Sequence, residues 1–286
     1  MPSDNDENAT PAIAGKAWLE LPGSVGNQEY VKTAYGDPEA DNGARNYSYN
    51  YDKDTFTSLW VAYPLYPSII SGSNSAGWKE NPDVPDEYEV NIYSHSYGVN
   101  VGSTTNEGYN DKQPYYARGH QIANADRKSS AKMNSQTYYV TNSTPQNSKF
   151  NGGIWGSLEA AVRNAIPASD TLYVVTGAAF QKNGEPEKDV VWILPQDEVS
   201  KRCPVPNYYW KVLLKVKRNA EGVVTGASSV GFWFEHKFVE GDAYANHVVS
   251  VDQIEQWTGF DFFVNLADSI ESTAETNASW MIFQNY

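Results

Sequence analysis

With 286 residues, 40% of them hydrophobic, the chain can bury one large core, and it has no apolar run long enough to predict a transmembrane helix. Its single cysteine, Cys203, excludes an internal disulfide and a multi-cysteine zinc site. The formal net charge of −14 argues against broad electrostatic capture of nucleic acid, although a bound cation can supply positive charge locally.

The first part of the chain predicts a tail followed by one domain. Residues 1–25 are rich in Asp, Glu, Asn, Pro and Gly, which is typical of a flexible acidic tail, and they lack the basic and apolar regions of a signal peptide. Residues 26–286 contain no Pro-, Ser- or Gly-rich linker, so we expect a single domain. Residues 58–63 predict a buried strand that ends near Pro64. Residues 72–114 predict a long irregular loop, of a kind that is usually functional.

The rest of the chain predicts strands and helices in mixed order. Residues 137–142, with their β-branched and aromatic side chains, predict a strand, and residues 143–147 predict a turn. Residues 151–166 predict an amphipathic helix, because apolar side chains recur at helical spacing before Pro167. Further elements expected are strands at residues 171–176, 208–217 and 227–235, and a short helix at residues 251–257 that Ser250 or Asp252 begins and Gly259 ends. Without repeated βαβ units, this order favours an α+β domain over a doubly wound one.

The histidines and the cysteine exclude several kinds of active site. The four histidines are His95, His120, His236 and His247. No two of them stand at metal-ligand spacing, so we expect no multi-histidine zinc site. Cys203 lies beside Pro204 with only Arg202 as a neighbouring cation, which makes it a poor nucleophile.

His120 has the setting that best suits chemistry. A histidine with a pKa near neutrality can take a proton from water. Arg118, two residues earlier, can stabilise developing phosphate charge through its planar donors, and Gly119 would let the backbone pass close to a substrate. The same three residues also fit an ordinary surface loop, so this pattern alone does not decide the function.

Asn151 and Glu159 form a second candidate pair. An amide oxygen and a nearby carboxylate suit Mg²⁺, which keeps several waters and needs few protein ligands. Asn151 fits equally well as the N-cap of the predicted helix, and Glu159 fits an exposed i,i+4 ion pair with Arg163. The residues by themselves leave both interpretations open.

Four segments follow one another in a specific order. They are Arg118-Gly119-His120, Thr141-Asn142-Ser143-Thr144-Pro145-Gln146, Phe150-Asn151-Gly152-Gly153-Ile154-Trp155 and Leu158-Glu159. This order resembles the DNA/RNA non-specific endonuclease family. The flanking segments that also resemble the family are Trp60-Val61-Ala62-Tyr63, the Val205-Pro206 to Lys211 strand, and residues 251–263. The likeness spans residues 28–265.

The resemblance implies a metal-dependent, sequence-nonspecific endonuclease that acts on DNA and RNA. It also implies a mostly antiparallel central sheet flanked by helices, with a ββα-metal finger. His120 would be the general base, Asn151 the protein ligand of one Mg²⁺ ion with Mn²⁺ as a substitute, and Glu159 the holder of a water on that ion. Arg118 would contact the scissile phosphate, and Asn142 would orient the site around His120. The expected products carry 5′-phosphate and 3′-hydroxyl ends.

Two departures from the family pattern predict a lower rate. Family members commonly show Asp-Arg-Gly-His, whereas this chain has Ala117 in place of the aspartate. Many members also carry an arginine in the preceding loop, but the matching stretch, residues 75–79, offers only Lys79 as a cation. Neither departure removes the predicted base or the predicted metal ligand.

A second hypothesis is a non-catalytic surface module that binds a sugar or a polypeptide through its 20 Tyr and 9 Trp residues. It gives no role to His120 or Asn151, whereas the nuclease hypothesis requires both. Under either hypothesis, the acidic leader suggests a bacterial protein that is exported, periplasmic or on the cell surface, with an export segment not present in this chain.

Overall fold

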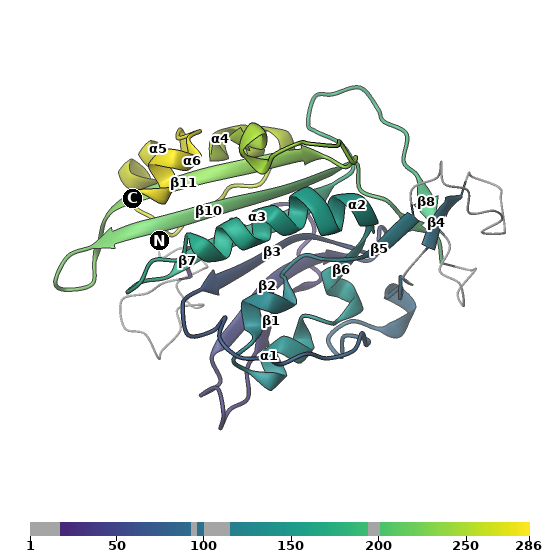
Figure 1. Cartoon of the computed structure of the whole chain (residues 1–286), viewed down its shortest axis with the longest axis horizontal. Coiled ribbons are helices and arrows are strands. Elements are labelled where there is room, and N and C mark those ends of the chain that lie inside the picture. The colour runs from purple at the N-terminus through teal and green to yellow at the C-terminus, as the bar shows by residue number, and fades with distance from the viewer. Residues whose placement is uncertain (1–17, 93–95, 100–114, 194–200) are drawn as a thin grey trace.

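The computed structural model of the chain describes residues 18–92, 96–99, 115–193 and 201–286. These residues form two β-sheets with helices packed on them, which is the α+β class predicted from the sequence (Figure 1). Within these ranges no helix is both long and apolar enough to cross a membrane. His95 lies outside the described residues.

The larger sheet has seven strands, and each neighbouring pair is antiparallel. In sheet order the strands are β1 (Val31–Tyr35), β2 (Arg45–Asp52), β3 (Thr57–Leu65), β7 (Leu172–Ala179), β10 (Tyr208–Arg218), β11 (Val224–Glu235) and β12 (Val248–Val249). Successive side chains of a strand point to opposite faces, and nine consecutive residues of β10 from Tyr208 are buried. Both faces of the sheet are therefore covered, and the strands predicted in this region are confirmed as β3, β7, β10 and β11.

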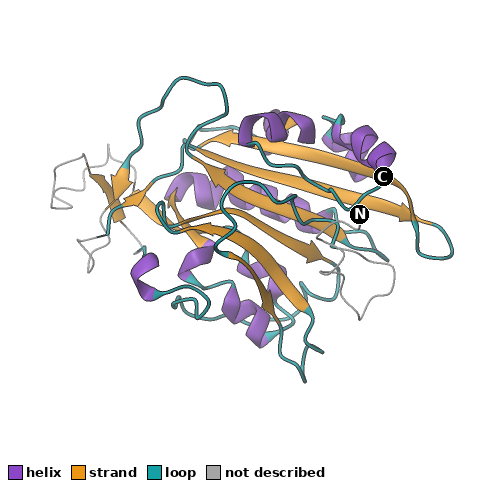
Figure 2. Ribbon diagram, turned by 180° about the vertical axis from the view of Figure 1, so that it is seen from behind, coloured by secondary structure: helices purple, strands orange, loops and turns teal. Residues whose placement is uncertain are grey.

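Helices cover the two faces of this sheet. On one face, Leu158 and Val162 of α3 (Gly156–Asn164) join the core cluster that contains Leu213 of β10. On the other face, Ile254 of α4 (Val251–Thr258) joins the cluster that contains Trp210 of β10. Figures 1 and 2 show α4 and α5 (Asp268–Glu275) running along β11. Two short helices are α1 (Ala131–Gln136) and α6 (Trp280–Gln284).

The smaller sheet carries the predicted finger. Its strand order is β6 (Ser143–Asn147), β5 (Tyr115–His120), β4 (Ser96–Val99), β8 (Trp192–Ile193) and β9 (Cys203–Pro204). From the antiparallel pair β5–β6 the chain runs directly into α2 (Ser148–Phe150), a π-helical turn (Asn151–Trp155) and α3. Two strands followed by a helix make up the ββα arrangement that the resemblance implied (Figure 1).

Two elements before that helix differ from the sequence prediction. Residues 137–142, predicted as a strand, form a turn and the 3₁₀ helix Val140–Asn142. Residues 143–147, predicted as a turn, form strand β6, which pairs with β5. Pro145 is tolerated there because β6 lies at the edge of its sheet, where a strand needs only one row of hydrogen bonds.

The packed domain begins earlier than predicted. Residues 18–22 are buried, so the expectation of a flexible tail through residue 25 is wrong for them, while residues 1–17 lie outside the described part. Trp18 packs in the core cluster of the α4 face, and Glu20 forms a buried ion pair with Arg45 of β2. The guanidinium of Arg45 also stands 3.9 Å from the centroid of the Trp18 ring. A few apolar residues near the end of this polar stretch thus pack residues 18–22 into the domain.

The C-terminal part confirms the predicted capping of α4. The Ser250 hydroxyl accepts from the amide of Gln253 at the start of the helix, and Gly259 ends it in the left-handed conformation with φ of 77°. The sequence did not predict α5 and α6, because α6 has only five residues and the N-cap position of α5 is an alanine that makes no side-chain cap bond.

Candidate active site

Strand β5 presents Arg118 and His120 on one face, because residues two apart in a strand point the same way. Gly119 faces the opposite side, where a Cβ atom would lie 2.3 Å from the Oε1 atom of Gln146 on β6. The glycine is therefore required by packing between the two finger strands. This replaces the earlier interpretation that it admits a substrate to the backbone.

The His120 ring packs between two aromatic side chains. Its centroid lies 4.6 Å from that of Trp78 and 5.1 Å from that of Tyr138. The Nε2 atom is buried and has no hydrogen-bond partner among the described residues. Burial, followed by the charges of Arg118 and Lys128, lowers the pKa of His120 to about 4. The imidazole is thus neutral at physiological pH and able to accept a proton.

Arg118 shares the Trp78 side chain with His120. Its guanidinium stands 5.1 Å from the centroid of the Trp78 ring, and its Nη1 atom donates to Oδ1 of Asn91 at 3.4 Å. Trp78 belongs to the loop stretch that lacks the arginine seen in many family members. The sequence did not single out Trp78 or Tyr138 as site residues. The signal that could have found Trp78 is a large aromatic side chain in an otherwise polar loop.

Asn142 braces the end of β5 from within the protein. It is fully buried, and its Nδ2 atom donates to the carbonyls of Thr137 at 2.7 Å and Ile122 at 3.0 Å. Its Oδ1 atom accepts from the backbone amide of Ile122 at 3.0 Å, and its carbonyl accepts from the amide of Gln121 at 2.9 Å. A buried side chain with these bonds cannot touch a substrate, so Asn142 is a positioning residue for the segment that follows His120.

The helix of the finger is capped by Asn147, whose side chain accepts from the amides of Lys149 and Phe150. Asn151 is therefore not the N-cap, and that alternative is excluded. It is half-buried and begins the π-helical turn, inside which Gly153 departs from helical geometry at φ −104°, ψ −107°. Single π-helical turns are frequent at functional sites, and this one sets the direction of Asn151 relative to α3.

Glu159 lies half-buried on α3, in a group of charges beneath the helix. Burial raises the pKa of its carboxyl to about 7, opposed chiefly by the charge of Lys211 on β10. Lys211 is 1% exposed, and its Nζ atom stands 4.8 Å from the centroid of the Trp155 ring. The alternative that Glu159 only forms an i,i+4 ion pair with Arg163 is not supported, because Arg163 bonds to Asp126 at 2.9 Å instead.

The donors of the finger suit a hard cation. Asn151 offers an amide oxygen from the first turn of the helix, and Glu159 offers a carboxylate further along it. The Nε2 atom of His120 is buried and has no hydrogen-bond partner among the described residues. A water molecule that reacts in the site would give this atom a partner. Oxygen donors of this type match Mg²⁺ or Mn²⁺ better than zinc, which prefers nitrogen and sulfur.

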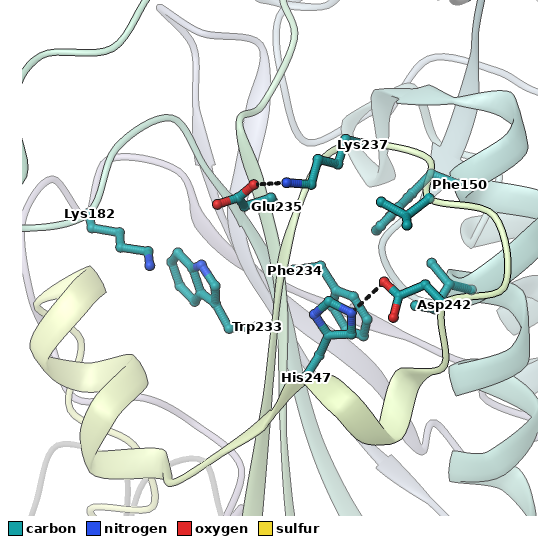
Figure 3. A pocket seen from close by; sticks show the side chains of 10 residues that line it. Phe150, Lys182, Trp233, Phe234, Glu235, Lys237, Asp242 and His247 are labelled. Atoms are coloured by element: carbon teal, nitrogen blue, oxygen red, sulfur yellow. Dashed lines mark hydrogen bonds and ion pairs between the residues drawn. The ribbon is translucent and has the colours of Figure 1, made fainter.

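A pocket of about 330 Å³ lies beside the first turn of the same helix (Figure 3). The finger lines it with Phe150 and Ile154, which flank Asn151 in sequence. On its other side His247 bonds to Asp242 at 2.7 Å and stacks on Phe234 with ring centroids 4.5 Å apart. The described residues that line the pocket include none of the five predicted site residues, so the pocket neighbours the predicted site and is not its centre.

Comparisons with known proteins place the chain in a family. The family model described as DNA/RNA non-specific endonuclease matches residues 28–269. The chain is 25% identical to a nuclease of Nostoc sp., over 80% of this chain and 75% of that protein. It is 25% identical to a nuclease of Serratia marcescens, over 80% of this chain and 77% of that protein. It is 27% identical to the mitochondrial nuclease EXOG of Danio rerio, over 80% of this chain and 63% of that protein.

The fold also matches a solved structure, that of the EndoG/EndoGI complex. The TM-score is 0.60 with 18% identity, and the match covers 86% of this chain and 91% of that chain. The relatives come from bacteria and from a vertebrate, so the similarity does not support the expectation of a bacterial source. The family match over most of the chain and the nuclease relatives identify a hydrolytic enzyme: the chain belongs to the DNA/RNA non-specific endonuclease family.

Proposed function

We propose that the chain hydrolyses phosphodiester bonds within DNA and RNA, with His120 as the general base. The observation that carries the proposal is the neutral imidazole of His120 at the end of β5. Its buried Nε2 atom has no hydrogen-bond partner in the described residues, and its side chain shares a strand face with Arg118. A base and a guanidinium on one face can act together on a single phosphate. The helix that follows in the finger brings Asn151 into the same motif.

Each residue of the finger has one task. His120 accepts the proton of the attacking water, and Arg118 donates hydrogen bonds to the scissile phosphate. Asn151 would hold the divalent cation, Mg²⁺ or Mn²⁺, which acts as a Lewis acid toward the leaving oxygen. Glu159 would hydrogen-bond a water in the same site while its carboxylate is ionised. Attack on phosphorus with departure of the 3′-oxygen leaves 5′-phosphate and 3′-hydroxyl ends.

The test is cleavage of supercoiled plasmid, single-stranded DNA and RNA with Mg²⁺, with Mn²⁺ and with EDTA. Cleavage of all three that depends on the metal supports the proposal, and cleavage of one polymer alone would narrow the substrate. The acidic charge of −14 predicts weak binding to the phosphate backbone, and thus a high KM. If the purified chain cleaved no nucleic acid with either metal, the surface-binding hypothesis would replace this one.

Replacing Asn151 with alanine is expected to abolish metal-dependent cleavage while leaving the thermal stability nearly unchanged. The reason is that Asn147 caps the helix and Asn151 does not. The matched variant Asn147→Ala should show the reverse pattern, with activity largely kept and a loss of stability of about 1 kcal/mol. Metal titration by calorimetry beside a thermal melt measures both effects. Loss of stability in Asn151→Ala with full metal affinity would contradict the ligand role.

The acidic limb of the pH profile of kcat/KM is expected near pH 4, well below the ordinary histidine value of 6.5, because burial and Arg118 lower the pKa of His120 to about 4. The base is neutral above that value, so activity should persist as the pH falls through 6.5 and disappear as it falls through about 4. Initial rates on a short oligonucleotide measure the profile. Lys128→Gln removes a charge that lowers this pKa and should move the limb upward. A limb at 6.5 in the native enzyme would argue against the buried imidazole.

A further inference from the structure

Three carboxylates meet between α4 and α5, on the face of the sheet opposite to the finger helix. Asp252 and Glu255 stand one turn apart on α4, and Glu275 is the last residue of α5. One oxygen from each lies within 4.8 Å of the other two. We call these three residues the acidic cluster. Figure 1 shows α4 and α5 along β11, well apart from α2 and β5.

Glu275 gives the cluster a feature that acidity alone does not. It is only 5% exposed, and its Oε1 atom has no hydrogen-bond partner in the part of the chain that the structure describes. Its carboxylate points at Asp252 and Glu255, since the three oxygens are so close. Glu271, one turn earlier on α5, also has a buried Oε1 atom without a described partner. Burial of an ionised carboxylate without a counter-charge is strongly unfavourable, so these atoms need a partner or a proton.

The negative charges around Glu275 make its ionised form still less favourable without a bound cation or a proton. The charged groups that act most strongly on it are all carboxylates: Glu255, Glu271, Asp252 and Asp261. Burial and these like charges raise the pKa of Glu275 to about 9. The charged groups that act on Glu255 and Glu271 are acidic as well. The charged groups that act most strongly on the pKa values of Glu255, Glu271 and Glu275 are therefore all acidic.

We propose that Asp252, Glu255 and Glu275 bind a calcium ion that joins α4 to α5. Ca²⁺ takes six to eight oxygen ligands at about 2.3–2.6 Å, so ligands on opposite sides of one ion lie about 5 Å apart. The three oxygens already lie within that span, and waters can complete the shell. Glu255 accepts from the amide of Phe262 through Oε1 at 2.7 Å, which leaves Oε2 for the ion. The absence of nitrogen and sulfur donors in the cluster argues against zinc.

Such an ion would stabilise the C-terminal half of the protein. The end of α5 is already fixed to β11, since the Ser229 hydroxyl donates to the Ala274 carbonyl at 2.9 Å. An ion at Glu275 would tie that anchored end to the first turn of α4. The site differs from the proposed finger site both in its residues and in its role, because it serves folding rather than cleavage.

The experiment uses the full chain freed of metal with EDTA and then dialysed. Thermal unfolding is followed as CaCl₂ is added, and binding is counted by calorimetry. At a Ca²⁺ concentration of about 100 times the Kd, we expect Tm to rise by roughly 5–10 °C. Glu275→Gln and Asp252→Asn should each lose this rise. Glu221→Gln, an exposed acidic residue in the β10–β11 turn, is the matched control and should keep it.

The metal-free variants provide a second readout. Glu275→Gln should be no less stable than the metal-free native chain, because a buried repulsive carboxyl is replaced by a neutral amide. Asp252 is exposed, so Asp252→Asn tests the site even if Glu275→Gln fails to fold. Asn151→Ala should keep the calcium response, which separates this site from the finger whether or not the enzyme is active.

Three outcomes would overturn the proposal. The first is a native chain whose Tm does not respond to Ca²⁺, which would mean that Glu275 is simply protonated. The second is a response kept in both Glu275→Gln and Asp252→Asn but lost in Asn151→Ala, which would place the ion in the finger. The third is an equal response to Mg²⁺, which would remove the preference for the larger cation.

Discussion

His120→Ala is expected to lower the rate of plasmid cleavage by about 10²–10⁴-fold, the range that a positioned general base contributes. The variant removes the imidazole that shares a strand face with Arg118. The ring packs between Trp78 and Tyr138, so its loss leaves a small space between two aromatic side chains. Nicking of supercoiled plasmid under saturating metal measures the rate, and circular dichroism confirms the fold.

Two controls separate the base from a packing role. Added imidazole should restore part of the rate in His120→Ala, because it can occupy the space and accept the proton. His247→Ala, which removes a histidine bonded to Asp242 at the neighbouring pocket, should cleave at close to the native rate. Undiminished cleavage by His120→Ala would contradict the assignment of His120 as the general base. Full loss of cleavage in His247→Ala would instead indicate that the neighbouring pocket contains the active site.

Lys211→Met is expected to lower the free energy of unfolding by roughly 1–3 kcal/mol, because it leaves the carboxyl of Glu159 buried without the charge that most favours its ionisation. Lys211 is almost fully buried, and it is the largest of the charges that favour ionisation of Glu159. Methionine fills a similar volume, so the loss is chiefly electrostatic. Glu159→Gln should also destabilise the protein, since it leaves Lys211 buried without its counter-charge. Chemical denaturation of both variants measures these values.

The double variant Glu159→Gln/Lys211→Met tests the coupling. It should be more stable than the sum of the two single losses predicts, by about 0.5–3 kcal/mol, because both buried charges are gone. Additive losses would show that the two groups do not interact. Arg163→Met offers a comparison from the same helix, since Arg163 bonds to Asp126 rather than to Glu159.

The pH dependence of Lys211→Met has a definite sign. The pKa of Glu159 is already raised from 4.5 to about 7, and removal of Lys211 should raise it further. A carboxyl whose pKa is raised on folding stabilises the protein at pH values below its ordinary pKa of 4.5. This stabilisation is lost as the pH rises through the folded-state pKa. The stability deficit of the variant relative to the native chain should therefore grow above about pH 7. Its cleavage should fall at neutral pH and partly recover in alkali, once Glu159 ionises.

The sequence indicated most of the finger. The order of Arg118, His120, Asn151 and Glu159 can be read from the sequence without a structure. The structure places Arg118 and His120 on one face of β5, and Asn151 and Glu159 on the helical segment that follows β6. The strands of the large sheet were predictable because their apolar runs are long. The Ser250 and Gly259 caps of α4 were predictable because a cap acts within a few residues of its helix.

Other features were not predictable because they depend on residues far apart in the chain. Strand β6 consists of polar residues and a proline, and it is a strand only because β5 pairs with it. Trp18 looks like part of a polar leader, yet it is buried in the core of the α4 face. Trp78 contacts His120 although 41 residues lie between them in the sequence.

By itself, the sequence determined the family and the α+β class, and it singled out His120 and Asn151 as the proposed base and metal ligand, since all of these depend on residue types in a fixed order. Only the tertiary structure decided what each residue is bonded to. Asn147 rather than Asn151 caps the finger helix, Asn142 bonds to the backbone of Ile122 and Thr137, and the charge of Lys211 acts on Glu159. The acidic cluster likewise exists only where α4 and α5 meet. The physical reason is that burial and charge pairing are set by neighbours in space, which local sequence patterns do not encode.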